Sequence, residues 1–176
     1  MKLGSSFAVV VCAALCMPFT SSAQEAVDLI ASDGFHLSSK WVVKDGVLSS
    51  SKKPGGILWS KKAYGDFAVT LEYKTTAKCN SGLFFRSDPK NAVQGGFEIQ
   101  IASAGLYSGK HVVGALYDAQ VPSKVAGKPD GEWNTMKLRV EGSTVTTWLN
   151  GVEMIQLKDD YIGSATGAIA LQIHDG

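Results

Sequence analysis

Three short segments of the sequence carry hydrogen-bonding side chains that could act together on a polar ligand. In two of them apolar and polar residues alternate, and successive side chains of a strand point to opposite faces, so the polar ones share a face. The side chains are Glu98 and Gln100 in residues 97–101, Gln172 and His174 in residues 168–174, and Asn80 and Arg86 in residues 80–86. Carboxylate, amide, imidazole and guanidinium groups beside aromatic residues suit a ligand covered in hydroxyl groups. A sugar has this chemistry; the alternative is a sheet face exposed only to solvent.

The same groups could instead carry out conventional glycoside hydrolysis or bind a metal ion. Conventional glycoside hydrolysis needs two carboxylates flanking the bond that is cleaved. Glu98 has no acidic residue two or four positions further on, and Asp118 is the partner that another strand could supply. A divalent metal ion could be held by Glu98, His174 and Asp118. His36 and His111 stand alone, which indicates loop or surface histidines, so a metal is left open and no other cofactor is indicated.

Strands joined by tight turns are predicted to position these groups. Residues 67–73 and 136–140 alternate apolar and polar side chains, as strands with one buried face do. Residues 44–46 and the dipeptide Asn150-Gly151 predict hairpins, because Asn and Gly both accept positive φ. Turn signals recur at short intervals, which favours an all-β, antiparallel sandwich. Residues 24–176 contain no linker or repeat and are predicted to form a single domain.

Length and composition fit one globular domain. The chain has 176 residues, of which 45% are hydrophobic and 19% charged, too apolar and too weakly charged for a disordered protein. Lys and Arg number 17 against 16 Asp and Glu, and no basic cluster interrupts the even spread. Because phosphate recognition needs concentrated positive charge, a nucleic-acid partner is not expected.

The first 23 residues resemble a secretory signal peptide. Lys2 precedes an apolar run over residues 7–17, and small residues end at Ala23, where cleavage is expected. The run is shorter than the roughly 20 residues that a membrane-spanning helix needs. We therefore expect export to the periplasm or the extracellular space and no membrane span in the mature chain. Cys79 would then be the one remaining cysteine, and we expect a buried free thiol there.

Several of these segments together resemble the 3-keto-disaccharide hydrolase family. The matching motifs cover the chain in the family's order from about Trp41 to its end, and they are residues 80–86, 96–101, 114–117, 131–134, 148–151 and 167–174. The resemblance implies a concanavalin A-like jelly roll, secretion, and action on glycosides oxidised at the sugar 3-position. Two features depart from the family: residues 102–105 lack its usual acidic residue, and no further strand follows residue 174. The jelly roll is therefore expected without its last strand, either because the strand is absent or because the chain is a fragment.

A ketone at C3 makes an elimination available. It acidifies the hydrogen on C2, so a base can remove that proton and the C1 substituent can leave; hydration of the enone then gives net hydrolysis. His174 is the predicted base, because imidazole titrates near neutral pH. Arg86 is predicted to stabilise the enolate, and Glu98 to orient the base or protonate the leaving group. The residues predicted to hold the sugar are Asn80, Gln100 and Gln172 through its hydroxyls, and Tyr117 and Trp133 by stacking.

A non-catalytic carbohydrate-binding module of the same fold is the main alternative to an enzyme. The missing acidic residue and the missing last strand favour it. A structural adhesion domain has no feature of the sequence behind it. In each of the first two cases the expected partner is a carbohydrate.

Overall fold

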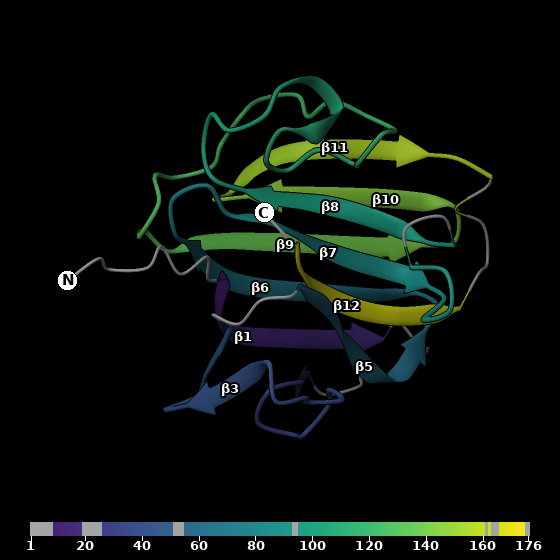
Figure 1. The fold of residues 1–176 in the computed structure, drawn as a ribbon. Helices are drawn as coiled ribbons and strands as arrows, with labels where there is room; N and C mark the ends of the chain where they lie inside the picture. Colours follow the sequence, from purple (N-terminus) through teal and green to yellow (C-terminus); the bar gives the residue numbers. More distant parts are fainter. Residues whose placement is uncertain are drawn as a thin grey trace.

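The protein is a sandwich of two antiparallel sheets (Figure 1). The computed structural model describes residues 9–18, 26–50, 55–92, 95–160, 162 and 166–174. The larger, eight-stranded sheet has the order β11-β10-β9-β6-β1-β4-β3, with β2 paired to β1, and the smaller sheet has the order β5-β12-β7-β8. Every strand pair is antiparallel, which confirms the predicted all-β jelly-roll class.

The elements are short, as the turn signals predict. The larger sheet contains β1 (Val9–Pro18), β2 (Val27–Asp28), β3 (Trp41–Lys44), β4 (Val47–Ser50), β6 (Phe67–Thr75), β9 (Asn134–Glu141), β10 (Thr144–Leu149) and β11 (Val152–Lys158). The smaller sheet contains β5 (Gly56–Tyr64), β7 (Asn80–Ser87), β8 (Phe97–Ala102) and β12 (Gly167–Ile173). A 3-10 turn, η1, covers Gly109–His111.

Alternating side chains of the two sheets build the core. Four apolar residues of β6 and three of β9 are buried at alternate positions, and they are Phe67, Val69, Leu71, Tyr73, Met136, Leu138 and Val140. The smaller sheet contributes Leu83, Phe85, Ile99, Ile101, Ile169 and Leu171 to the same cluster. Within the small sheet, the residues that alternate with this core set therefore point away from the core, to the outer face of the sheet. That face carries four of the polar residues singled out in the sequence, Asn80, Glu98, Gln100 and Gln172.

Both predicted hairpin turns are present. Asp45 and Gly46 between β3 and β4 have φ of 52° and 73°, and Asn150 and Gly151 between β10 and β11 have φ of 52° and 82°. Positive φ at both central positions is the type I′ geometry whose twist matches that of the paired strands. The register of β3 against β4 follows from its turn. The Asn150-Gly151 turn sets the first two pairs of β10 with β11, and a bulge between Thr147 and Trp148 shifts the register beyond them.

The segment predicted to be a signal peptide contains a strand. β1 lies between β6 and β4 in the larger sheet and pairs with β6 from Val9↔Thr75 to Pro18↔Phe67. Residues 1–8 and 19–25, including the expected cleavage point, lie outside the described residues. Cleavage after Ala23 therefore stays a prediction.

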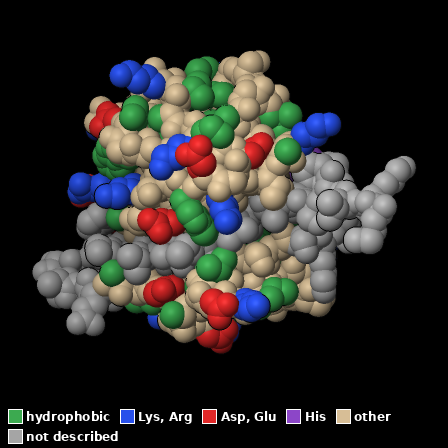
Figure 2. Space-filling view, turned by 90° about the vertical axis from the view of Figure 1, so that its left-hand side faces the viewer, with side chains coloured by type: hydrophobic (Ala, Val, Ile, Leu, Met, Phe, Trp, Pro, Cys, Tyr) green, Lys and Arg blue, Asp and Glu red, His purple; other side chains and the backbone are tan. Residues whose placement is uncertain are grey.

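The surface and Cys79 agree with the expectations from the sequence. On the face drawn in Figure 2, basic and acidic side chains are interspersed. Within the described ranges, no helix is long and apolar enough to cross a membrane. Cys79 is a free cysteine with 2% of its surface exposed, and burial, followed by the charge of Asp130, raises the pKa of its thiol to about 12. The predicted buried free thiol is confirmed.

Candidate functional site

Glu98 and Gln100 lie on the outer face of the small sheet, as the alternation predicts. β8 pairs with β7 so that Glu98 is opposite Phe84 and Gln100 is opposite Gly82. The intervening Ile99 is fully buried in the core, so the two polar side chains face away from it. Both are nevertheless well buried, with 8% of Glu98 and 1% of Gln100 exposed. Strand parity thus placed them correctly, but on a covered surface rather than an open one.

A glycine makes room for the Glu98 carboxylate. A Cβ atom built on Gly82 would lie 1.9 Å from Glu98 Oε1 and 2.6 Å from its Cδ. The Glu98 side chain therefore crosses from β8 and occupies the space above Gly82, next to Gln100. No other residue type fits at position 82 without moving the carboxylate.

The segment after β8 folds back beside it and brings Tyr117 next to Glu98. Leu116 forms a bridge with Ile99, and the Tyr117 N–H donates to the Glu98 carbonyl at 2.9 Å. Leu116 is buried beneath, so Tyr117 lies on the same side as Glu98. This irregular strand begins at Gly114 (φ 83°) and ends at Asp118 (φ 56°), where the chain turns away.

The pKa values of Glu98 and Tyr117 are both raised. Burial, followed by the charge of Asp118, raises the pKa of Glu98 from 4.5 to about 7. Among the described residues, none forms a hydrogen bond with this carboxylate. Burial also raises the pKa of Tyr117, with further contributions from Asp118, Glu98 and Tyr107. A carboxyl group that titrates near neutral pH can accept and return protons, and such groups concentrate at functional sites.

His111 and Asp118 form an ion-pair-like contact beside Tyr117. His111 Nε2 is 2.6 Å from Asp118 Oδ1, and the His111 ring stacks on the Tyr117 ring at 4.6 Å between centroids. Lys110 Nζ donates to the Asp118 carbonyl at 3.1 Å. The sequence indicated a loop or surface position for His111, and its partners lie seven and six residues away in a loop without periodicity. Pattern reasoning had no signal for this contact.

The predicted amide groups form the next part of the face. Gln100 Nε2 donates to Asn80 Oδ1 at 2.9 Å, while Gln100 Oε1 is buried without a partner among the described residues. Gln172 is half-buried, and its carbonyl accepts from the Ser81 hydroxyl at 2.7 Å. The His174 N–H donates to the Asn80 carbonyl at 3.4 Å. Strand spacing places the His174 and Glu98 backbones about 16 Å apart, at opposite ends of this patch.

Arg86 is not part of the patch, which corrects its predicted contact with an enolate. Its side chain is fully buried in the ion pair with Asp66, and its guanidinium donates to Asp66 Oδ1 and to three backbone carbonyls, those of Gly65, Gly142 and Ile162, at 2.7 to 3.1 Å. Burial lowers the pKa of Arg86, and Asp66 opposes that shift. Arg86 has φ of 48°, which a side chain tolerates only where its surroundings hold it. It joins turns at one end of the sandwich.

Two further predictions concern Trp133 and a metal. Trp133 precedes β9 in the larger sheet, is 39% exposed, and has Lys74 Nζ 5.2 Å from its ring centroid. The structure does not bring it to Glu98. In the described part of the chain, no group of three or more His, Cys, Asp or Glu residues is placed to hold a metal ion.

A comparison with protein families decides the relationship that these motifs suggest. The profile of the 3-keto-alpha-glucoside-1,2-lyase-like domain matches residues 28–176. The chain belongs to this family. No protein of curated function matches it.

Solved structures agree with this lyase-like domain in fold. A "putative glycosyl hydrolase" from Parabacteroides distasonis is 25% identical, with a TM-score of 0.71 over 80% of this chain and 85% of that one. A second from the same organism is 22% identical, with a TM-score of 0.72 over 82% and 84% of the two chains. The carbohydrate binding module CBM66 from Bacillus subtilis is 14% identical, with a TM-score of 0.56 over 81% and 88%, and it shows the sandwich fold alone.

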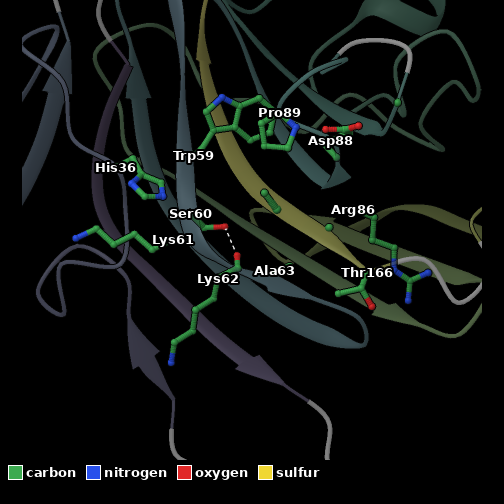
Figure 3. Close-up of a pocket in the computed structure, with 14 residues that line it drawn as sticks. His36, Trp59, Ser60, Lys61, Lys62, Ala63, Arg86, Asp88, Pro89 and Thr166 are labelled. Atoms are coloured by element: carbon green, nitrogen blue, oxygen red, sulfur yellow. Dashed lines mark hydrogen bonds between the residues drawn. The ribbon is translucent and has the colours of Figure 1, made fainter.

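The lyase-like domain also has a pocket that the sequence did not predict. It has a cavity volume of about 790 Å³ and lies at the end of the small sheet away from His174 (Figure 3). Its lining includes His36, Trp59, Lys62, Asp88 and Ala168. Arg86 is at its edge, and Figure 3 shows the guanidinium directed toward Thr166 and away from Trp59. The sequence indicated a loop or surface position for His36.

Proposed function

We propose that this domain cleaves glycosides whose sugar carries a ketone at C3. The observation that carries the proposal is the Glu98 carboxylate, which is buried, lacks a hydrogen-bond partner among the described residues and has a pKa of about 7. Family membership supports this substrate class, because the family is described as 3-keto-alpha-glucoside-1,2-lyase-like. A base whose pKa lies near the working pH is suited to remove the C2 hydrogen, which the C3 ketone makes more acidic.

The elimination uses Glu98 as its base. The carboxylate removes the C2 proton, and the electron pair of that C–H bond forms the C2–C3 double bond of an enolate, with the charge on the C3 oxygen. Collapse of the enolate expels the C1 oxygen substituent, which takes up a proton, and leaves a C1–C2 double bond conjugated to the ketone. Water then adds across this double bond, so the sum is hydrolysis with no change in oxidation state.

Neighbouring groups supply the remaining functions. Tyr117 lies next to Glu98 and can donate its hydroxyl proton to the leaving oxygen or hold the enolate oxygen. The His111–Asp118 pair stacks against Tyr117 and fixes its ring. Gln100 Oε1, buried without a described partner, can accept from a sugar hydroxyl, and Asn80 orients the Gln100 amide. Glu98 thereby replaces His174 as the proposed base.

Replacement of Glu98 tests the proposal directly. Glu98→Gln keeps the side-chain shape and removes the base, so turnover of a 3-keto-glucoside is expected to fall by about 10²- to 10⁴-fold. Enone formation or aglycone release gives the readout. Glu72→Gln is the matched control, because Glu72 is exposed on β6 in the other sheet. Full turnover by Glu98→Gln would refute the role of Glu98 as base.

His174 is tested in the same assay. It is exposed and lies at the far end of the patch, so His174→Ala is expected to raise KM by a few-fold and to leave kcat within about twofold. A loss of kcat as large as that of Glu98→Gln would show that His174, and not Glu98, is the base.

Conventional hydrolysis is a second candidate, because the structure brings Asp118 close enough to raise the pKa of Glu98. The carboxyl groups of Glu98 and Asp118 would then be an acid and base pair of the kind that glycosidases use. The two functions separate on substrate: the elimination requires the C3 ketone, whereas hydrolysis by two carboxylates proceeds on the unoxidised glycoside. Saturable binding of both sugars without product would instead identify a binding module.

A further inference from the structure

Two bulges at the same level of the small sheet form the pocket around Trp59. Between Ala168 and Ala170, β12 advances two residues while β5 advances four, from Ala63 to Trp59, and β7 advances three, from Ser87 to Phe84. Bulges bend a sheet and re-aim its side chains, and they are frequent next to binding sites. Both neighbours of β12 therefore bend at the place where the cavity lies (Figure 3).

Buried polar contacts hold these bulges in place. The Ser60 hydroxyl accepts from the Ile169 N–H at 3.0 Å and donates to the Lys62 carbonyl at 2.6 Å, which fixes the β5 bulge. On the other side, the four partners of the Arg86 guanidinium hold its positive φ within the β7 bulge. Glycine is required at position 167, at the start of β12 between the two bulges, because a Cβ there would lie 2.4 Å from the Arg86 carbonyl carbon. The pocket is thus a rigid feature of the fold.

The lining of the pocket combines an aromatic ring with neutralised charges. Trp59 is half-buried, and Figure 3 shows it together with His36 and Asp88 at one end of the pocket. Lys61 is paired with Asp33 and Arg86 with Asp66, which leaves one basic and one acidic residue of the lining, Lys62 and Asp88, so the formal charges balance. No charge excess therefore favours an ion. An indole surface with hydroxyl, imidazole, carboxylate and ammonium groups around it suits an uncharged ligand with C–H faces and many hydroxyls.

Trp59 and Glu98 belong to one row of the outer face. Trp59 is opposite Ala170, Ala170 is opposite Phe84, and Phe84 is opposite Glu98. Three strand spacings separate their backbones, which is about 14 Å. That span corresponds to more than one sugar ring.

We propose that the Trp59 pocket is a second sugar subsite, which holds an uncharged pyranose ring of the same substrate by stacking on the indole. The assignment of the reacting ring to Glu98 rests on the proposed function, whereas binding of a pyranose at Trp59 does not.

Binding of unoxidised glucose disaccharides, α- and β-linked, tests the subsite without turnover. Titration of the full chain followed by NMR is expected to give a saturable shift of the Trp59 indole N–H. Trp59→Ala is expected to weaken Kd by about tenfold, and Ala63→Leu, which fills the pocket from an exposed position on β5, by a similar factor. Trp148→Ala is the matched control, since Trp148 lies on β10 in the larger sheet, and it should bind as the wild type does.

Kinetics separate this inference from the proposed function. For a 3-keto-disaccharide, Trp59→Ala is expected to raise KM by about tenfold, with KM for a methyl 3-keto-glucoside unchanged. A wild-type protein that binds disaccharides at Trp59 but cleaves neither substrate would refute the proposed function and leave the subsite standing. Disaccharide binding that leaves the Trp59 indole unperturbed, or a Trp59→Ala affinity equal to that of the wild type, would refute the subsite.

Discussion

Burial disfavours the charged form of the Glu98 carboxyl group, so ionisation of this group lowers the stability of the fold. Its folded pKa of about 7 lies above the ordinary value of 4.5, and the protonated form is therefore favoured in the folded state. The contribution of protonated Glu98 to the free energy of unfolding is complete below pH 4.5 and is lost as the pH rises through 7. Between pH 5 and 8 the free energy of unfolding is expected to fall by about 2 to 3 kcal/mol from this group.

Urea unfolding of wild type and Glu98→Gln at pH 5 and 8 measures this contribution. The variant cannot ionise, so the stability difference between the two proteins should change by that amount over the interval. A constant difference would show that Glu98 is not buried as the structure has it. The same titration predicts that kcat/KM on a 3-keto-glucoside rises with an apparent pKa near 7.

Gly82 is expected to be as important for activity as Glu98. Gly82→Ala places a Cβ 1.9 Å from Glu98 Oε1 and so displaces the carboxylate from its position. We expect turnover to fall by about 10²-fold, with a loss of stability of about 1 to 3 kcal/mol. Gly65→Ala is the control, because its Cβ would meet only Thr166 Oγ1 at 3.4 Å. Unchanged activity in Gly82→Ala would show that the carboxylate position above Gly82 is not the active one.

At the level of single residues, the sequence predicted positions on strands better than contacts between loops. Glu98 and Gln100 were placed on the correct face because a strand alternates strictly. The contact of His111 with Asp118 depends on how an aperiodic loop folds back along β8, which no local pattern encodes. Arg86 followed a strand motif, but positive φ turns its side chain toward three turns that lie far from it in the sequence.

Arg86 acts at the level of elements, because it joins the end of β7 to turns of both sheets. Its guanidinium bonds the β5–β6 turn at Gly65 and Asp66 and the β9–β10 turn at Gly142. Arg86→Met removes these bonds and leaves buried carbonyls unpaired, so the free energy of unfolding is expected to fall by about 3 kcal/mol or more.

Denaturant unfolding tests this role against a matched arginine. Arg139 is paired with Glu141 on the exposed side of β9, and Arg139→Met should change stability by no more than about 0.5 kcal/mol. If Arg86→Met were equally mild, the guanidinium would not be holding the turns. Loss of activity in Arg86→Met beyond its loss of folded protein would instead indicate a direct part in the site.

The strands and hairpins themselves were largely predictable from local patterns. Alternation located β6 and β9, and the Asp45-Gly46 and Asn150-Gly151 turns fixed two hairpin registers. The double bulge beside β12 was not predictable, because it arises from buried contacts of Ser60 and Arg86 with residues more than 50 positions away. The pocket around Trp59 depends on those bulges, and it was missed for that reason.

For the whole molecule, the apolar segment near the N-terminus has two incompatible interpretations. As a signal peptide it would be removed with cleavage after Ala23, whereas as β1 it lies inside the larger sheet. β4 pairs within the described residues with β3 and β1 alone, and β6 pairs with β9 and β1. Removal of residues 1–23 would therefore detach the β3–β4 hairpin from the sheet and leave β6 with an unpaired edge, which promotes aggregation.

Comparison of residues 1–176 with residues 24–176 decides between these interpretations. Nine residue pairs join β1 to β6, and at about 0.5 kcal/mol for each pair the shorter chain should lose about 4 kcal/mol. For a domain of this size that lowers Tm by about 10 °C. Hydrogen exchange should accelerate in β4 and β6 and stay slow in β7 and β8, because the small sheet makes no pairing with β1. The mass of the protein isolated from its natural cells then shows which chain exists there. A chain that begins at Gln24 and melts at the temperature of the longer one would mean that β1 contributes nothing to the mature sheet.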